Sequence, residues 1–216
     1  MTIQPELSLI TDESGISRCA WGAQTSEYIE YHDTEWGVPI RDDRALFERL
    51  SLESFQSGLS WLTVLRKRDA FREVFQDFEP EIVANFDEAM IGQLLGDARI
   101  IRHRKKIEST VNNARALLAA WELHGHDWLT QTLLAHTPTE RELSDLGWLR
   151  PPTQLSQIPP KTPHTQALSI HLKRAGFVFL GPTTLHAALQ ATGFINDHLI
   201  GCHRYESVDG CRQAQK

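Results

Sequence analysis

The sequence predicts an all-α protein. Apolar residues recur at helical spacing along most of the 216 residues, and alternating strand patterns bounded by Asn-Gly or Asp-Gly turns are missing. Prolines gather between residues 138 and 163, where we expect an irregular connector that joins the middle helices to the C-terminal ones.

Each predicted helix rests on its own local pattern. Two apolar sets at helical spacing follow one another at residues 44–52 and 59–65. Pro80 suits the start of a helix, because the first turn has no use for its missing N–H group. Asp87 has the position of an N-cap ahead of the next apolar set, and residues 101–121 form one long amphipathic pattern.

The chain is long enough for one large domain or two small lobes. We expect a poorly patterned N-terminal extension at residues 1–17, a helical domain of two lobes at residues 18–205, and a C-terminal tail at residues 206–216.

Composition narrows the class of protein. No apolar run approaches the roughly 18 residues that span a bilayer, and the polar N-terminus does not resemble a secretion signal. We therefore expect a cytoplasmic protein without a membrane partner, and nothing in the sequence demands more than a monomer. The net charge of −6 argues against an extended nucleic-acid surface. The basic clusters at residues 66–68 and 102–106 are either solvated helix faces or a local surface of that kind.

Four residues at the two ends of the chain form a complete Cys2His2 ligand set for zinc: Cys19, His32, His198 and Cys202. Structural zinc takes four nitrogen or sulfur ligands and usually collects them as two close pairs. His198 and Cys202 lie four residues apart, so that both can reach one ion from a single helical face or turn. The alternative is a coincidence of two buried thiols and two core histidines.

A second pattern lies between residues 174 and 184, where Gly176 and Gly181 flank a short apolar segment that begins with Phe177. Glycines let a backbone approach a ligand closely, and the N–H groups at the start of the next helix, at Thr183 and Thr184, form an anion site. Two helices joined by such a hairpin can hold a DNA phosphodiester without reading sequence. A plain corner between two helices is the alternative.

Six short sequence motifs occur between residues 18 and 203, in the order in which a known protein family carries them. They are Cys19-Ala-Trp21, Tyr28-Ile-Glu-Tyr-His-Asp-Thr-Glu-Trp-Gly-Val-Pro39, Leu52-Glu-Ser-Phe-Gln-Ser-Gly-Leu-Ser-Trp61, Ile100-Ile-Arg-His-Arg104, Gly176-Phe-Val-Phe-Leu-Gly181 and Asn196-Asp-His198. On these motifs the chain resembles the bacterial 3-methyladenine-DNA glycosylase I family.

The resemblance implies an all-helical helix-hairpin-helix DNA glycosylase with a zinc site that joins the N- and C-terminal segments. The residues that match the structural zinc ligands are Cys19, His32, His198 and Cys202. In the family, the residue that matches Glu53 contacts the flipped base, and the residues that match Tyr31 and Trp61 line the pocket.

The residues themselves fit that chemistry. Tyr28 and Tyr31 share a helical face, and Trp36 and Trp61 add flat surfaces on which an extruded base can stack. Glu53 lies in an apolar stretch, which favours its burial with a partner or ligand. An adenine alkylated at N3 is cationic in DNA, so aromatic rings and one carboxylate favour it over normal adenine. The alternatives are core-filling aromatic residues and a capping or surface glutamate.

The expected function is base-excision repair of double-stranded alkylated DNA, with hydrolysis of the glycosidic bond of 3-methyladenine. Asp197 is a second candidate catalytic group, although its neighbour His198 favours a role in supporting the metal site. Lyase activity would need a hairpin lysine, and no lysine occurs between Lys173 and Lys216. A monofunctional enzyme that leaves an abasic site is therefore expected.

Two other classes of protein share parts of these patterns. A zinc-stabilised nucleic-acid-binding protein would use the hairpin but would not need Glu53 in an aromatic pocket. A zinc hydrolase would need an open coordination position, which a site with four protein ligands does not leave.

Overall fold

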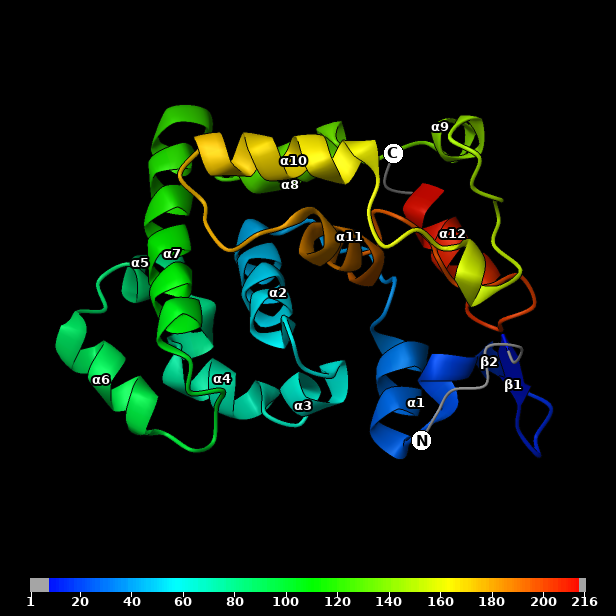
Figure 1. Ribbon diagram of the computed structural model, residues 1–216, viewed down its shortest axis with the longest axis horizontal. Helices are drawn as coiled ribbons and strands as arrows, with labels where there is room; N and C mark the ends of the chain where they lie inside the picture. Colours follow the sequence, from blue (N-terminus) through cyan, green and yellow to red (C-terminus); the bar gives the residue numbers. More distant parts are fainter. Residues whose placement is uncertain (1–7, 214–216) are drawn as a thin grey trace. The chain divides into compact units, whose positions relative to one another are not determined.

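The computed structural model describes residues 8–213, and most of them are helical (Figure 1). They form two compact units. Unit 1 contains residues 8–39, 137–162 and 189–213, and unit 2 contains residues 40–136 and 163–188. Residues 1–7 of the predicted N-terminal extension and residues 214–216 of the predicted tail lie outside the described residues. Across residues 8–213, no helix has the length and apolar character needed to cross a membrane.

Unit 1 is assembled from three separate stretches of the chain. Its elements are β1 (Leu9–Thr11), β2 (Ser17–Cys19), the 3-10 helix η1 (Ala20–Ala23), α1 (Ser26–Thr34), α9 (Glu140–Asp145), the 3-10 helix η3 (Leu155–Gln157) and α12 (Tyr205–Gln213).

The two strands are a difference from the sequence prediction, which contained none. β1 and β2 pair antiparallel, with Leu9 opposite Cys19. The turn between them is built locally: an oxygen of Asp12 accepts hydrogen bonds from the N–H groups of Ser14 and Ile16, at 2.9 and 3.0 Å. Gly15 adopts a φ of 81°, which a glycine tolerates at no steric cost. Strands of three residues are too short to show an alternating pattern.

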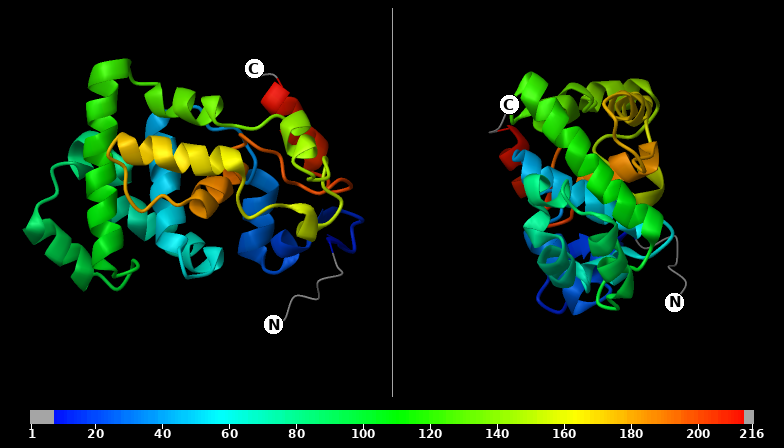
Figure 2. Two further views of the ribbon diagram at one scale, coloured as in Figure 1. Left: turned by 45° about the horizontal axis from the view of Figure 1, so that its top comes forward. Right: turned by 90° about the vertical axis from the view of Figure 1, so that its left-hand side faces the viewer.

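Unit 2 is helical. Its elements are α2 (Asp43–Gln56), α3 (Trp61–Leu65), α4 (Arg68–Val74), the 3-10 helix η2 (Gln76–Phe78), α5 (Pro80–Val83), α6 (Glu88–Gly96), α7 (Arg104–His124), α8 (Trp128–Ala135), α10 (Pro163–Arg174) and α11 (Pro182–Ala191), whose last residues belong to unit 1. In Figure 1 and Figure 2 α10 runs beside α8, and the rings of Trp128 and His171 lie 6.1 Å apart between them.

Most predicted helix starts are confirmed. Pro80 is the first residue of α5, and Asp87 caps α6 by accepting a hydrogen bond from the N–H group of Met90 at 2.9 Å. The long helix predicted at residues 101–121 is α7, shifted by three residues at each end. The His103 side chain caps its start, and Gly125, with a φ of 99°, follows its last residue.

The prediction was wrong in two details, the start of one helix and the content of the connector. The helix expected at residues 59–65 begins only at Trp61, because the hydroxyl group of Ser60 caps it, and Leu59 is left exposed. The connector at 138–163 is not wholly irregular, since α9 lies within it. Thr139 and Glu142 form a capping box, in which each side chain accepts a hydrogen bond from the other residue's backbone N–H group.

A cluster of phenylalanines lies in the core of unit 2. Phe47, Phe55, Phe71, Phe75 and Phe78 are all at most 1% exposed. Phe75 stacks on Phe78 with the ring centroids 5.2 Å apart, and Phe71 lies 4.5 Å from Phe55. The helices α2 and α4 and the 3-10 helix η2 are held together by these contacts.

One buried carboxylate joins three helices of unit 2. Asp43, the first residue of α2, accepts a hydrogen bond from the indole N–H group of Trp121 on α7 at 2.8 Å. It also accepts bonds from the N–H groups of Leu129 and Thr130 on α8, at 2.8 and 2.7 Å, and from the Thr130 hydroxyl group at 2.6 Å. Four donors therefore converge on one side chain that is 3% exposed. Hydrogen bonds to a charged group are among the stronger ones in proteins.

We predict that Asp43→Ala lowers the free energy of unfolding by about 3–5 kcal/mol, because four buried donors lose their acceptor. Urea denaturation of the variant and the wild type measures the difference. Asp69→Ala is the control, since the Asp69 side chain is 98% exposed and should change stability by less than about 0.5 kcal/mol. Equal stability of the two variants would contradict the role given to Asp43.

Candidate functional site

The four predicted metal ligands lie together in unit 1. Cys19, His32, His198 and Cys202 are buried, and their ligand atoms all lie within 4.8 Å of one another. The Sγ atom of Cys202 is 3.5 Å from Nε2 of His32 and 3.6 Å from Nδ1 of His198. The Sγ atom of Cys19 is 3.9 Å from the same Nδ1 atom. The structure therefore brings together residues that are up to 183 positions apart in the chain.

The outer nitrogen of each imidazole is held by an acceptor. Nδ1 of His32 lies 2.8 Å from a carboxylate oxygen of Asp33, and Nε2 of His198 lies 3.0 Å from the carbonyl oxygen of Trp36. A carbonyl or ionised carboxylate only accepts, so these outer nitrogens carry the protons and the inner nitrogens face the thiols as acceptors. Acceptors of this kind orient the histidines of metal sites.

Asp33 is itself fixed by several donors. Nε of Arg18 donates to it at 2.9 Å, and Nε2 of His203 lies 2.8 Å from it. Burial raises the pKa of Asp33, but the hydrogen bonds from Arg18, His32 and His203 outweigh this effect and hold the pKa below its ordinary value. Sequence reasoning missed Arg18 and His203; the Asp beside a ligand histidine was the signal that could have indicated such a supporting shell.

The backbone leaves room for the ligands only because of a glycine. A Cβ atom on Gly22 would lie 2.5 Å from a ring carbon of His32. Any side chain there would displace His32, so Gly22 in the 3-10 helix η1 is a packing requirement of the cluster.

Three predicted pocket residues also belong to unit 1, close to this cluster. Tyr31 and Trp36 are at most 9% exposed, and Trp21 lies between Tyr28 and Trp36, with centroid distances of 5.8 and 4.8 Å. The Trp36 ring is 4.5 Å from the ring of His198. Trp21 and Trp36 therefore pack directly on the histidines of the Cys2His2 cluster, and Tyr28 and Tyr31 pack on Trp21.

Asp197, the second candidate catalytic group, is 1% exposed in unit 1. It forms an ion pair with Nη1 of Arg150 and accepts a hydrogen bond from Gln190 at 2.6 Å. Arg150 also donates to the carbonyl oxygen of Asn196 at 2.7 Å and to Glu140 of α9 at 2.7 Å. Arg150 and Asp197 thus form a structural ion pair, which joins the connector at residues 138–163 to the C-terminal stretch that contains His198. A catalytic role for Asp197 stays a prediction.

Glu53 and Trp61, the other two predicted pocket residues, belong to unit 2. Glu53 lies near the end of α2 and Trp61 begins α3, and they are 5% and 8% exposed. The turn between the two helices is fixed by Lys106 of α7, whose ammonium group donates to the carbonyl oxygens of Phe55 and Ser57 at 2.9 and 2.6 Å. A buried glutamate and an indole are thus held on either side of one anchored turn.

Burial dominates the electrostatics of Glu53. It raises the pKa of Glu53 to about 7, and the positive charge of Arg49, one helical turn earlier, opposes the rise. Nε of Arg49 lies 3.3 Å from Oε1 of Glu53. The carboxyl group is therefore poised between its neutral and ionised forms at neutral pH, as in many functional sites.

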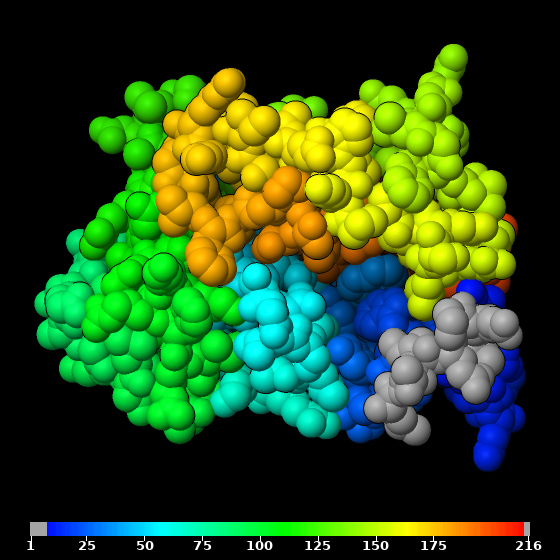
Figure 3. All heavy atoms as spheres, in the orientation of Figure 1, coloured from blue at the N-terminus to red at the C-terminus, as the bar shows by residue number. Residues whose placement is uncertain are grey.

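The predicted DNA-binding segment forms an irregular hairpin between α10 and α11 in unit 2, and it lies at the surface (orange in Figure 3). Gly176 ends α10 with a φ of 93°, and Phe179 adopts a φ of 63°. Phe177 is buried, whereas Val178 and Phe179 are 44% and 41% exposed. The α11 helix starts at Pro182, so the N–H groups of Thr183 and Thr184 lie in a first turn that has no intrahelical acceptors.

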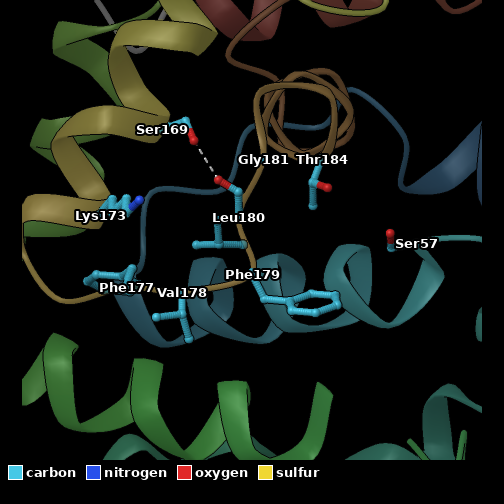
Figure 4. A pocket seen from close by; sticks show the side chains of 9 residues that line it. All are labelled: Ser57, Ser169, Lys173, Phe177, Val178, Phe179, Leu180, Gly181 and Thr184. Atoms are coloured by element: carbon cyan, nitrogen blue, oxygen red, sulfur yellow. Dashed lines mark hydrogen bonds between the residues drawn. The ribbon is translucent and has the colours of Figure 1, made fainter. Parts of the chain in front are cut away.

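Polar side chains from three helices hold this hairpin. On α7, Asn112 donates to the carbonyl oxygen of Gly176 at 2.8 Å, and Asn113 both donates to and accepts from the backbone of Val178, at 3.0 and 2.8 Å. Ser54 of α2 donates to the carbonyl oxygen of Phe179 at 2.9 Å, and Ser169 of α10 to that of Leu180 at 2.8 Å (Figure 4). Sequence reasoning missed these residues; the polar Asn113 between Val111 and Ala114 of α7 was the available signal.

An open recess of about 460 Å³ adjoins the hairpin. Its lining consists of Ser57, Ser169, Lys173, Phe177, Val178, Phe179, Leu180, Gly181 and Thr184 (Figure 4). Lys173 brings a positive charge and Thr184 a hydroxyl group to the same recess. Lys173, Ser57 and Ser169 were not among the residues singled out from the sequence.

The raised pKa of Glu53 generates a prediction about stability. In the unfolded chain the carboxyl group loses its proton near pH 4.5, and in the folded protein only near pH 7. Between these values the folded state binds the extra proton, so this contribution to stability is present below pH 4.5 and is lost as the pH rises through 7.

We therefore expect the stability of Glu53→Gln relative to the wild type to increase by about 3 kcal/mol between pH 4.5 and pH 8, following the shift of the pKa. Urea denaturation at several pH values measures it. Asp69→Asn, at an exposed carboxyl group, should show no such trend. A pH-independent difference for Glu53→Gln would show that Glu53 titrates normally.

Comparison with known proteins agrees with this architecture. A sequence model of the methyladenine glycosylase family matches residues 21–205. The chain is 42% identical over 192 residues to DNA-3-methyladenine glycosylase 1 of Escherichia coli strain K12, covering 88% of this chain and 97% of that protein. It is 40% identical over 188 residues to DNA-3-methyladenine glycosylase of Haemophilus influenzae, covering 86% and 96%.

Among solved structures, a variant of 3-methyladenine DNA glycosylase I in complex with 3-methyladenine superimposes with a TM-score of 0.78 at 36% sequence identity. The match covers 87% of this chain and 97% of that one. From the matched residues and the shared helical fold, the chain belongs to the methyladenine glycosylase family.

Proposed function

We propose that this protein is a monofunctional DNA N-glycosylase of base-excision repair, which hydrolyses the glycosidic bond of 3-methyladenine in alkylated DNA and leaves an abasic site. Two relatives are named for this activity, and the match with this chain covers nearly their whole length. A similar structure is described in complex with 3-methyladenine. The observation that carries the proposal is the buried Glu53 of unit 2, which shares the guanidinium group of Arg49 with the buried indole of Trp61. We assign the activity to the predicted domain at residues 18–205.

The proposed chemistry needs little help from a general acid. A 3-methyladenine base is cationic while attached to deoxyribose and becomes neutral when it leaves, so it is a good leaving group. An ionised Glu53 stabilises the cationic base, and the electron deficiency that develops on the sugar is stabilised in the same way. Trp61 offers a flat face for stacking. Tyr28, Tyr31 and Trp36 are retained as predicted base-contacting residues.

We propose further that α10, the hairpin and α11 form a helix-hairpin-helix element that binds the backbone of double-stranded DNA. Backbone N–H groups at a helix start bind phosphate oxygens without reading sequence. The residues proposed for this contact are Gly176, Phe177, Gly181, Thr183 and Thr184. The exposed hairpin and the lysine of its recess support the proposal.

The donor set of unit 1 fits structural zinc. With zinc–sulfur bonds of about 2.3 Å and zinc–nitrogen bonds of about 2.0–2.1 Å, a tetrahedral site has sulfur–nitrogen edges of about 3.6 Å. The sulfur–nitrogen distances of 3.5, 3.6 and 3.9 Å agree with such edges. We propose that Cys19, His32, His198 and Cys202 hold zinc, which would cross-link the ends of the chain.

This donor set argues against the zinc hydrolase. Four protein ligands complete a tetrahedron, and a catalytic zinc keeps a position for water or substrate. The nucleic-acid-binding protein without chemistry is the remaining alternative, and it gives no reason for a buried carboxyl group with a pKa near 7.

The main test is the release of the free base. Purified protein incubated with methylated DNA should release 3-methyladenine, identified by chromatography. Glu53→Gln should lower kcat/KM roughly 100-fold with the fold intact, because the negative charge at the base is lost. Glu48→Gln, which alters a carboxyl group paired with Arg72 on the same helix, should retain most activity. Unchanged base release by Glu53→Gln would exclude the proposed role.

The zinc proposal has a separate readout. The purified chain should contain one zinc ion, measured by elemental analysis, and Cys202→Ser should lose it together with several degrees of thermal stability. Cys211→Ser should keep the metal, because Cys211 is exposed and is not part of the cluster. Full zinc content in Cys202→Ser would argue against the four-ligand site.

The absence of a hairpin lysine predicts the chemical outcome. Borohydride should trap no covalent complex between the protein and substrate DNA, because a Schiff base requires an amine at the sugar. A lyase-competent glycosylase serves as the positive control in the same gel assay. A trapped species would refute monofunctional hydrolysis.

A further inference from the structure

Arg49, Glu53 and Trp61 form one buried cluster in unit 2. Arg49 and Glu53 lie one turn apart on α2, with Nε of the guanidinium group 3.3 Å from Oε1 of the carboxyl group. The central guanidinium carbon lies 4.4 Å from the ring centroid of Trp61, over the indole. Arg49 is only 7% exposed, which is rare for an arginine.

The position of Arg49 gives it two contacts at once. Its charge faces the carboxyl group of Glu53, and its planar group covers one face of the Trp61 indole. A cation over the face of an indole is attracted by the electrons of the ring, more strongly when water is excluded. Glu53 and one face of the Trp61 indole are thus both in contact with Arg49 before any ligand binds.

The charges of Arg49 and Glu53 act on one another. Burial lowers the pKa of Arg49 to about 10, and the charge of Glu53 opposes this effect, so Arg49 stays cationic at neutral pH. Arg68 and Arg72 of α4 also lower the pKa of Arg49 by repulsion. Arg72 is partly compensated by Glu48, with which it forms a 2.8 Å ion pair. Arg49 is the charged group that lowers the pKa of Glu53.

We propose that Arg49 is a positioning residue of the base pocket, which fixes the orientation and the negative charge of Glu53 and covers one face of Trp61. This inference rests on the proposed function of Glu53 and Trp61 as base-contacting residues. Without the guanidinium group, a fully buried carboxyl group takes up a proton rather than remain charged. A neutral Glu53 no longer attracts a cationic base.

The first test measures Glu53 directly in the ligand-free protein. With glutamate labelled at the side-chain carboxyl carbon, the NMR signal of Glu53 is identified by its loss in Glu53→Gln. Arg49→Met should raise the midpoint of its titration by at least about one pH unit, since the favourable charge is removed. Arg49→Lys, which keeps the charge, should restore a midpoint close to that of the wild type.

Two further variants keep this test decisive. Arg44→Met makes the same chemical change on α2, where the side chain of Arg44 is 44% exposed, and it should leave the Glu53 midpoint unchanged. If Arg49→Met does not fold, Arg49→Gln removes the charge while leaving polar atoms in the buried position. A Glu53 midpoint that is the same in wild type and in the charge-removing variant overturns the proposal.

The second test measures base release from methylated DNA as a function of pH. At pH 7, kcat/KM of Arg49→Met should fall at least about fivefold, as the ionised fraction of Glu53 falls from about one half to about one tenth or less. At pH 9 the difference should shrink to less than about twofold, because Glu53 then ionises in both proteins. A purely structural role of Arg49 would lower activity equally at both pH values, and this result would also overturn the proposal.

The two tests separate the inference from the proposed function. A shifted Glu53 midpoint in a protein that releases no base supports the control of Glu53 ionisation by Arg49 and rejects the glycosylase. Base release by the wild type together with an unshifted midpoint supports the glycosylase and rejects the proposed role of Arg49.

Discussion

Unit 1 depends on the contact of four side chains, because the stretches that build it are far apart in the chain. Cys19 and His32 come from the N-terminal stretch, and His198 and Cys202 come from the C-terminal one. Bringing such distant stretches together costs conformational entropy, so the contacts between them must be strong enough to offset it. The buried thiols and imidazoles, with their outer nitrogens held by Asp33 and the Trp36 carbonyl, are suited to supply them. The third stretch joins through Arg150, whose guanidinium group reaches Asp197 and Glu140.

Unit 2 uses buried charge in a different way. Asp43 receives four donors, and Lys106 donates to two carbonyl oxygens at the end of α2. In both cases a charged group compensates polar groups that helix ends leave without partners. Glu53 and Arg49 are buried together as an ion pair, in which burial raises the pKa of Glu53 and lowers that of Arg49. The same helix thus carries a charge that stabilises the fold at its start and a titratable pair near its end.

Sequence patterns predicted the long helices well because a helix of several turns repeats its apolar spacing many times. The α7 helix and the capping role of Asp87 are examples. Short elements lack that redundancy: the strands at Leu9–Thr11 and Ser17–Cys19 depend on the turn chemistry of Asp12 and Gly15. Thr139 and Glu142 have the spacing of a capping box, but the surrounding prolines led us to expect an irregular segment there. The Cys2His2 cluster was predictable because His198 and Cys202 are spaced to reach one ion and the family resemblance matches all four residues to metal ligands. Arg49 was not, since an arginine on a helix is ordinarily solvated.

The hairpin between α10 and α11 has a consequence for how freely this surface can change. Four of its carbonyl oxygens are engaged by side chains of the surrounding helices, through Asn112, Asn113, Ser54 and Ser169. Side chains of the neighbouring helices therefore fix the path of the main chain, and the exposed side chains of Val178 and Phe179 are not needed for it. Little ordering entropy would remain to be lost in the DNA contact proposed for this hairpin. Position 178 can therefore change its side chain while the loop keeps its shape, whereas position 179, with a φ of 63°, tolerates fewer replacements.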